Sequence, residues 1–168
     1  MSVLENLTLE TSRMILRSFR PEDAQDCFAF LSDAETCRLD GGYPPFTDMQ
    51  SEAYRHLMDR FAIHKRRWMM VRREDGRVMG TIMFHQDKSG GTDSFDVGYV
   101  TAPAYRRQGY TLEALSALMT CARREGVKRL TATTFPENAP SQRLLEKLGF
   151  EKIGEDAKTV YFQAILNP

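Results

Sequence analysis

The chain has 168 residues, with 23 acidic and 23 basic side chains and three cysteines. This length is typical of a single domain over residues 1–168, and the balanced charge argues against nucleic acid or an anionic membrane as the main partner. The odd number of cysteines does not suit a disulfide framework, so we expect a reducing compartment. With no leader pattern and no apolar run long enough to span a membrane, the sequence predicts a cytoplasmic protein.

The first half of the chain predicts one strand and two helices. Residues 13–19 predict a strand, with Met14, Leu16 and Ser18 on one face and Ile15, Arg17 and Phe19 on the other, and Pro21 ends it because proline cannot donate to a ladder. Residues 21–33 and 48–65 place apolar side chains at helical spacing. Between them, the glycines and prolines of residues 40–46 predict a loop.

The second half predicts strands separated by two more helices. Residues 68–86 contain two apolar runs around Asp75 and Gly76, a pair of residues that favours a tight hairpin turn. Strict alternation over residues 93–100 predicts a further strand. The remaining predicted elements are a helix over 112–122 that Gly126 ends, a strand over 128–135, a helix over 138–150 that a Schellman contact between Phe150 and Leu145 closes, and a strand over 159–166.

This order of elements predicts an α/β or α+β fold. A helical crossover joins residues 93–100 to residues 128–135, and such crossovers normally join parallel neighbours. The other strands are expected to pair mainly antiparallel. We therefore predict a mixed, mostly antiparallel sheet of six to seven strands flanked by about four helices.

The segment "YRRQGYTLEAL", residues 105–115, joins a predicted strand to a predicted helix. A helix leaves its first backbone N–H groups unpaired and carries a partial positive charge at that end. Arg106, Arg107 and Gly109 precede the helix where a capping side chain is usual, which indicates an anion pocket, most economically for phosphate. The alternative is a solvated turn in which Thr111 or water caps the helix. The segment lacks the glycine and lysine spacing of a P-loop and of a dinucleotide fingerprint.

Three segments resemble the GCN5-related N-acetyltransferases (GNAT superfamily). Arg106, Gly109 and Thr111 fall on a motif of arginine or glutamine, two residues, glycine, one residue, and glycine or alanine. Arg106 and Gly109 match it, and Thr111 departs from it at the last position. "LETSRMILRSFRPEDA" is similar to the opening of the branch that acetylates the N-termini of ribosomal proteins, and "NAPSQRLLEKLGF" to the closing helix of the family. The resemblance covers residues 9 to about 165. It implies the acyl-CoA N-acyltransferase fold, acetyl-CoA as cosubstrate, and an amine as acceptor.

The resemblance also assigns roles to residues. The loop would hold the diphosphate of acetyl-CoA, the backbone N–H near Val100 would stabilise the oxyanion, and Asn138 would bind the pantetheine arm. Many relatives protonate the leaving thiolate with a tyrosine, but Leu145 stands at that position here, so Ser141 is the candidate proton donor. The residues expected to bind the cofactor are Val100, Arg106, Arg107, Gln108, Gly109, Tyr110, Thr111 and Asn138.

Acetyl transfer to an amine also needs the amine to be neutral. An α-amine is about 10 to 20% neutral at pH 7 and a lysine amine well under about 0.1%, so a lysine acceptor needs more help. Asp96 is the candidate base, because it shares a strand face with Gly98 and Val100 just before the loop. An ordinary solvent-facing aspartate is the alternative for Asp96, and a pure capping role is the alternative for Asn138 and Ser141.

The sequence assigns no single role to several other side chains. The three histidines lack zinc spacing, so we expect no metal site. Tyr43, Phe46 and Trp68 are candidates for an acceptor cleft, and the basic run at residues 64–67 is a candidate RNA contact. The favoured function is acetyl transfer from acetyl-CoA to a primary amine, either a protein N-terminal α-amine or a small molecule, by a monomer or homodimer. The alternative is a non-catalytic module that senses coenzyme A or binds RNA.

Overall fold

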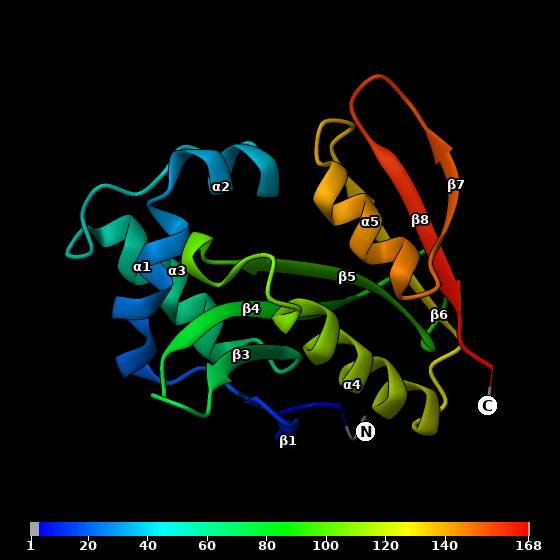
Figure 1. The fold of residues 1–168 in the computed structure, drawn as a ribbon, viewed down its shortest axis with the longest axis horizontal. Helices are drawn as coiled ribbons and strands as arrows, with labels where there is room; N and C mark the ends of the chain where they lie inside the picture. The colour runs from blue at the N-terminus through cyan, green and yellow to red at the C-terminus, as the bar shows by residue number, and fades with distance from the viewer. Residues whose placement is uncertain (1–3, 168) are drawn as a thin grey trace.

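The computed structural model describes residues 4–167 and shows one mixed sheet with helices on both faces (Figure 1). The strands are β1 (Leu9–Glu10), β2 (Met14–Arg17), β3 (Arg67–Arg72), β4 (Val78–Gln86), β5 (Ser94–Thr101), β6 (Arg129–Thr134), β7 (Glu151–Glu155) and β8 (Val160–Ile165). The helices are α1 (Ala24–Leu31), α2 (Ala34–Asp40), α3 (Glu52–Ile63), α4 (Tyr110–Arg124) and α5 (Ala139–Lys147), with short 3-10 turns at Pro21–Asp23 and Pro103–Tyr105.

The strands lie in the order β1-β2-β3-β4-β5-β6-β8-β7. All neighbours are antiparallel except β5 and β6, which are parallel. The predicted parallel pair and the mixed, mostly antiparallel sheet are therefore confirmed. The α4 crossover between β5 and β6 explains this pairing, because a parallel connection must return along the whole strand.

Within residues 4–167 the sheet has eight strands and the chain forms five α-helices, so both predicted counts were too low. The elements missing from the prediction are β1, β7 and α2. Strand β1 has two residues, and all five residues of β7 are exposed, so neither carries a readable burial pattern. In this part of the chain, no helix has both the length and the apolar content that crossing a membrane requires.

Two hydrophobic cores lie on opposite faces of the sheet. One joins α4 and α5 to the sheet through Leu115, Leu118 and Leu145. The other joins α1 and α3 through Phe30 and Phe61. The apolar run of β3 serves both cores: its residues Trp68 and Met70 belong to the first, and Met69 and Val71 to the second, because successive strand residues point to opposite faces.

Several predicted boundaries are confirmed. Gly76 has φ of +72° at the turn between β3 and β4, and Gly126 has φ of +83° after α4. The Schellman contact also forms, because the Phe150 amide donates to the Leu145 carbonyl at 2.9 Å after Gly149, whose φ is +88°.

The sheet opens along the second half of β5. The β5–β6 ladder includes only Ser94–Asp96 of β5, which continues to Thr101. On its other edge, β5 stays paired with β4 as far as Thr101. There the backbones lie so close that a Cβ on Gly80 would be 2.2 Å from the Val100 carbonyl oxygen. The free stretch of β5 is therefore held rigidly on one side and open on the other.

Candidate active site

The N-terminus of α4 lies beside the free stretch of β5. Gly109 is the N-cap residue, with φ of +79°, and it offers no side chain to the first helical N–H groups. Arg107 also has a left-handed backbone, with φ of +61°, which is uncommon for a residue other than glycine. Arg107, Gln108 and Gly109 are exposed. The predicted helix start without a capping side chain is thus present, in a backbone conformation that suits anions.

Arg106 has structural partners within the protein. Its Nε donates to the Thr101 carbonyl at 3.1 Å, and its Nη2 donates to the Thr36 hydroxyl at 2.5 Å. Thr36 lies in the first turn of α2, where Asp33 caps the helix by accepting from the Thr36 amide at 2.9 Å. Arg106 therefore ties α2 to the end of β5. The Thr111 hydroxyl is 2.6 Å from that of Thr101, so its side chain is held against the strand.

A further arginine, Arg13, lies over this turn, and no local pattern in the sequence predicted it. Its guanidinium stacks on the buried Tyr110 ring at 4.2 Å and pairs with Glu113 at 2.8 Å. It also donates to the carbonyl of Gln108 at 2.8 Å. Because Arg13 contacts only acceptors and a ring face here, it leaves the N–H groups of the turn unoccupied by its own atoms.

The amide groups of successive residues in β5 point to opposite edges of the strand. The Ala102 amide donates to Met79 of the β4 side, while the Asp93 carbonyl accepts from Lys128 on the β6 side. Successive residues alternate, so the Val100 amide points toward β4, whereas the amides of Tyr99 and Thr101 point toward the gap. The sequence placed the oxyanion donor near Val100. The strand pairing directs the amides of its two neighbours to the gap instead.

The start of α5 faces Tyr99 across the gap. The Asn138 side chain caps α5 by accepting from the Ser141 amide at 3.3 Å. The Ser141 hydroxyl is 2.5 Å from the Tyr99 hydroxyl, and burial raises the pKa of Tyr99 to about 12. Tyr99 is thus protonated at neutral pH and can act as a hydrogen-bond donor. Leu145, one turn further along α5, is fully buried in the core.

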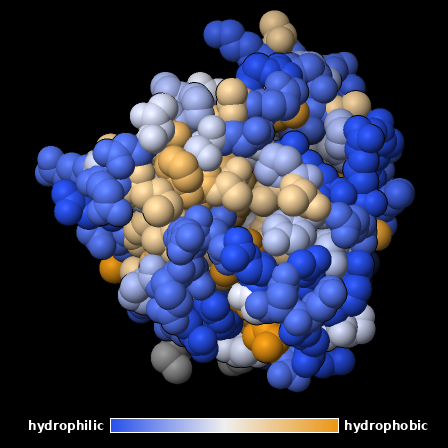
Figure 2. Space-filling model, turned by 60° about the vertical axis from the view of Figure 1, so that its left-hand side comes forward, coloured by the Kyte–Doolittle hydropathy of each residue, from blue (hydrophilic) through white to orange (hydrophobic). Residues whose placement is uncertain are grey.

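A cavity of about 660 Å³ adjoins the same strand on the side of α2 and α3. Gly98, Tyr99 and Val100 line it, as do Tyr43 and Phe46, which the sequence suggested for an acceptor cleft. Trp68, suggested for the same cleft, is instead fully buried in the other core. Figure 2, turned toward the N-terminal helices, shows a band of apolar side chains bordered by polar ones on this side.

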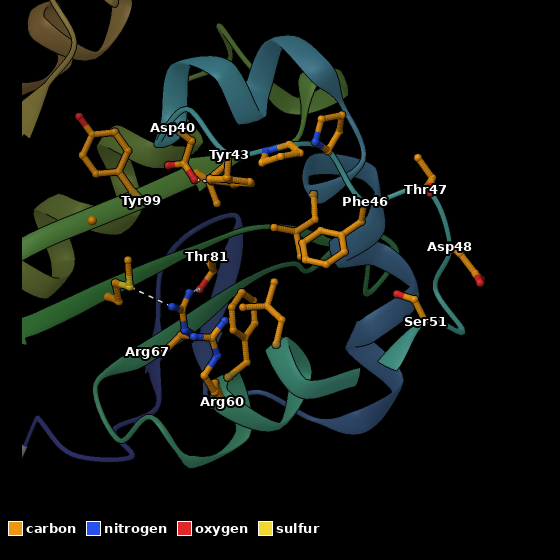
Figure 3. A pocket seen from close by; sticks show the side chains of 18 residues that line it. Asp40, Tyr43, Phe46, Thr47, Asp48, Ser51, Arg60, Arg67, Thr81 and Tyr99 are labelled. Atoms are coloured by element: carbon orange, nitrogen blue, oxygen red, sulfur yellow. Dashed lines mark hydrogen bonds between the residues drawn. The ribbon is translucent and has the colours of Figure 1, made fainter. Parts of the chain in front are cut away.

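Asp40, at the end of α2, supplies a carboxylate to this cavity (Figure 3). Its Oδ2 accepts a hydrogen bond from the Tyr43 hydroxyl at 2.7 Å. Asp40 is open to solvent through the cavity, yet the protein that crowds its carboxylate raises its pKa above the usual value. Asp40 was not among the predicted site residues, because α2 was not predicted.

Asp96 lies elsewhere on the same sheet face and is not among the residues that line the cavity. Its Oδ1 accepts from the Thr131 hydroxyl at 2.9 Å, and it is opposite His85 in the β4–β5 ladder. Burial raises its pKa. His85 in turn contacts His64 at 3.3 Å. Within the described residues, no three histidine, cysteine, aspartate or glutamate side chains are grouped so that they could hold a metal ion.

Solved structures described as acetyltransferases are similar in fold to this chain. A GNAT-family acetyltransferase from Bacillus anthracis superimposes with a TM-score of 0.82 at 23% identity, covering 95% of this chain and 98% of that one. A putative ribosomal-protein-serine acetyltransferase from Vibrio cholerae gives 0.73 at 21% identity, covering 98% and 99%. The fold, with its opened sheet and uncapped α4, is therefore that of the acyl-CoA N-acyltransferases.

Sequence similarity identifies the family to which the chain belongs within this fold class. Residues 13–151 match the family model "Acetyltransferase (GNAT) domain". The uncharacterized N-acetyltransferase YoaA of Bacillus subtilis is 34% identical over 153 residues, which cover 87% of this chain and 84% of that protein. YnaD of the same organism, also an uncharacterized N-acetyltransferase, is 27% identical, covering 94% and 96%. The chain belongs to the GNAT acetyltransferase family, and it is an acetyl-CoA-dependent N-acetyltransferase.

Proposed function

We propose that the protein transfers the acetyl group of acetyl-CoA to a primary amine by direct attack within a ternary complex. The observation that carries this proposal is the free stretch of β5, with the uncapped N-terminus of α4 at one end and the cavity beside it. A diphosphate at the helix end and an amine in the cavity would meet along this strand. Membership of an enzyme family argues against the non-catalytic alternative.

The cofactor would bind along the opened edge of the sheet. The N–H groups at the start of α4 would hold the diphosphate, helped by the exposed Arg107, while the pantetheine arm would pair with β5 in place of β6. Arg106 would both support this turn and add positive charge. The residues proposed to contact the cofactor are those expected from the sequence: Val100, Arg106, Arg107, Gln108, Gly109, Tyr110, Thr111 and Asn138.

The oxyanion of the transition state would be stabilised by the Tyr99 amide. This N–H points into the gap and belongs to a strand that its close contact with β4 makes rigid. A preorganised donor of this kind contributes about 3 to 4 kcal/mol to the transition state.

Two carboxylates are candidates for accepting the proton of the amine. Asp40 is favoured over Asp96, the residue expected from the sequence, because Asp40 lies in the cavity. A raised pKa also brings a carboxylate closer to the operating pH, which favours general-base catalysis. The departing thiolate would take a proton from Ser141, relayed from the Tyr99 hydroxyl.

The acceptor proposed from the sequence was a protein N-terminal α-amine or a small-molecule amine. The Vibrio cholerae structure is described as a putative ribosomal-protein-serine acetyltransferase, and that description favours a protein acceptor by similarity of fold alone. The cavity, enclosed by α2, α3 and the sheet, favours a small one.

Calorimetric titration with acetyl-CoA tests the first half of the proposal, and release of free thiol in the presence of a panel of amines tests the second. We expect saturable one-site binding and amine-dependent thiol release. Absence of binding at millimolar acetyl-CoA would refute the proposal. Binding of acetyl-CoA without thiol release in the presence of any amine would favour the alternative, a non-catalytic module that senses coenzyme A.

Ser141→Ala is expected to lower kcat about 10-fold and to leave the Kd for acetyl-CoA unchanged within about a factor of two. The effect is modest because a thiol with a pKa of about 8.5 is a good leaving group and water can supply the proton. Tyr99→Phe, which removes the partner hydroxyl, should give a loss of similar size. Equal losses in kcat and in acetyl-CoA affinity would argue against Ser141 as the proton donor.

A further inference from the structure

Arg67 is a cation in the cavity that has no acidic partner among residues 4–167. Among the described residues, no carboxylate oxygen lies within 4.0 Å of its nitrogens, and its Nε is buried without a hydrogen-bond partner. Its Nη1 donates to the Thr81 hydroxyl at 3.3 Å and its Nη2 to the Met83 sulfur at 2.9 Å, both neutral acceptors. By contrast, Arg17, which is also shielded from solvent, makes two hydrogen bonds to the carboxylate of Asp23.

Shielding a guanidinium in this way costs free energy unless an anion compensates it. The guanidinium lies over the Phe61 ring at 3.8 Å, so one face contacts an apolar surface. Burial lowers the pKa of Arg67 to about 10, which still leaves it protonated at neutral pH. Each terminal nitrogen has one N–H beyond the hydrogen bonds just described, and Arg67 lines the cavity. The protein thus presents an unneutralised planar donor pair to whatever occupies the cavity.

The opposite charge lies across the cavity. In Figure 3, Arg67 and Arg60 come from the side of β3 and α3, whereas Asp40 and Tyr43 come from the side of α2. Asp40 acts on Arg67 only over this gap, since the two do not form an ion pair. Asp48, at the far rim, has its Oδ1 engaged with the amide of Gln50. A cationic wall, formed by Arg67 and Arg60, therefore faces an anionic wall, formed by Asp40 with Tyr43.

The space between the two walls is mainly apolar. Phe46, Leu57 and Phe61 line it, together with the two prolines that follow Tyr43. Planar donor pairs of arginine match the geometry of a carboxylate, and an amine suits a carboxylate such as that of Asp40. The cavity is therefore complementary to a molecule with an amine, a carboxylate and an apolar group close together.

We propose that the acceptor is a free amino acid with an apolar side chain, or a compound of that class, whose carboxylate binds Arg67 while its amine faces Asp40. This inference rests on the proposed acetyl transfer. The neutral amine attacks the thioester carbon and forms the N–C bond as the C–S bond breaks. The amine loses its proton to Asp40, and the thiolate gains one from Ser141, which recovers it from the Tyr99 hydroxyl. Asp40 releases its proton to solvent and Tyr99 takes one up from solvent, so the products are an N-acetylamino acid and coenzyme A and the protein returns to its starting state. A protein N-terminus lacks the adjacent carboxylate and would leave Arg67 unpaired.

The first test measures binding without any reaction. 3-Phenylpropionate carries the carboxylate and the apolar group but no amine, and its Kd is measured by calorimetry on the full chain. We expect Arg67→Met to raise this Kd about 10- to 100-fold, because a charge-assisted contact is lost. Arg67→Lys, which keeps the charge without the planar fork, should give an intermediate value. Arg55→Met removes an exposed arginine of α3 outside the cavity and should have no effect. Thermal unfolding of each variant verifies that it is folded.

The second test compares L-phenylalanine with L-phenylalaninamide in acetyl transfer. We expect kcat/KM for the acid to exceed that for the amide at least about 10-fold, and Arg67→Met to remove this preference. Equal or better turnover of the amide by the unaltered protein, or of a peptide N-terminus, would overturn the inference while acetyl transfer stands. Failure of the proposed function has a different signature: acetyl-CoA would not bind, although 3-phenylpropionate still bound in a manner that depends on Arg67.

Discussion

Replacing Gly109 with aspartate is expected to weaken acetyl-CoA binding by about 1,000-fold. Gly109 caps α4 in a left-handed conformation, beside the N–H groups proposed to bind the diphosphate. A carboxylate about 4 Å from a phosphate near a protein surface costs about 4 kcal/mol, which corresponds to this change in Kd. Aspartate is among the few residues that tolerate the left-handed region. A Cβ at position 109 would lie 3.3 Å from Nη2 of Arg13, so the Arg13 side chain has to move slightly, in the asparagine variant as in the aspartate variant. Calorimetric titration measures the Kd.

Gly109→Asn is the matched control, because asparagine has the size of aspartate and also tolerates this backbone conformation, but it carries no charge. We expect it to retain most of the affinity that Gly109→Asp loses. Gly126→Asp makes the same change at the other end of α4, at a glycine that is likewise left-handed, with φ of +83°. A Cβ there would meet no atom within 4 Å. It should leave the affinity unchanged. Similar affinities for the aspartate and asparagine variants at position 109 would show that no phosphate lies there.

Asp40→Asn is expected to lower kcat/KM by about 100- to 10,000-fold, the range for removal of a general base. Asparagine can still accept the hydrogen bond from the Tyr43 hydroxyl, so the cavity should keep its shape. The change therefore tests proton transfer and leaves the packing intact. Thiol release, measured with the best acceptor from the panel, gives the rate.

The pH dependence gives an independent signature of Asp40. A base must be deprotonated to act, so the activity of the unaltered protein should fall as pH decreases through the pKa of Asp40. Because the surrounding protein raises this pKa, the fall should begin above the usual range for aspartate. Because protonation of the amine itself also lowers the rate at low pH, Asp40→Asn should remove only the further fall that comes from Asp40, and the fall that comes from the amine should stay. Asp96→Asn is the comparison, since the pKa of Asp96 is raised as well but it lies outside the cavity. Loss of the acid limb in Asp96→Asn alone would return the role of base to Asp96.

The sequence predicted the elements that are governed by local chemistry. The helix that follows Gly109, the turn at Gly76 and the parallel pairing of β5 and β6 all follow from backbone preferences or crossover rules, and all are confirmed, although α4 begins two residues before the predicted Leu112. Helix α2 has only seven residues, and helices of that length are held by tertiary contacts and not by propensity. The hydrogen bond from Arg106 to Thr36 is such a contact, and it joins residues 70 positions apart.

The parts of the site that were missed depend on pairing between distant segments. Whether the amide of Tyr99 or that of Val100 faces the gap is decided by the register of β5 with β4. Alternation predicts that Arg66 and Arg67 point in opposite directions, but not which of them faces a cavity. In the structure, Arg66 pairs with Glu5, whereas Arg67 faces the cavity. The resemblance to the family predicted the cofactor loop, but it did not predict the cationic wall of the cavity that contains Arg67.

The double attachment of Arg106 restricts how this protein can change. The family motif accepts arginine or glutamine at this position, which suggests that the two are interchangeable. Here the guanidinium reaches both the Thr101 carbonyl and the Thr36 hydroxyl. A glutamine is shorter and has a single amide nitrogen, so it would have to give up one of them. Replacing Arg106 with glutamine would therefore weaken the attachment of α2 to β5 and lower the stability of the protein, even before any ligand is bound.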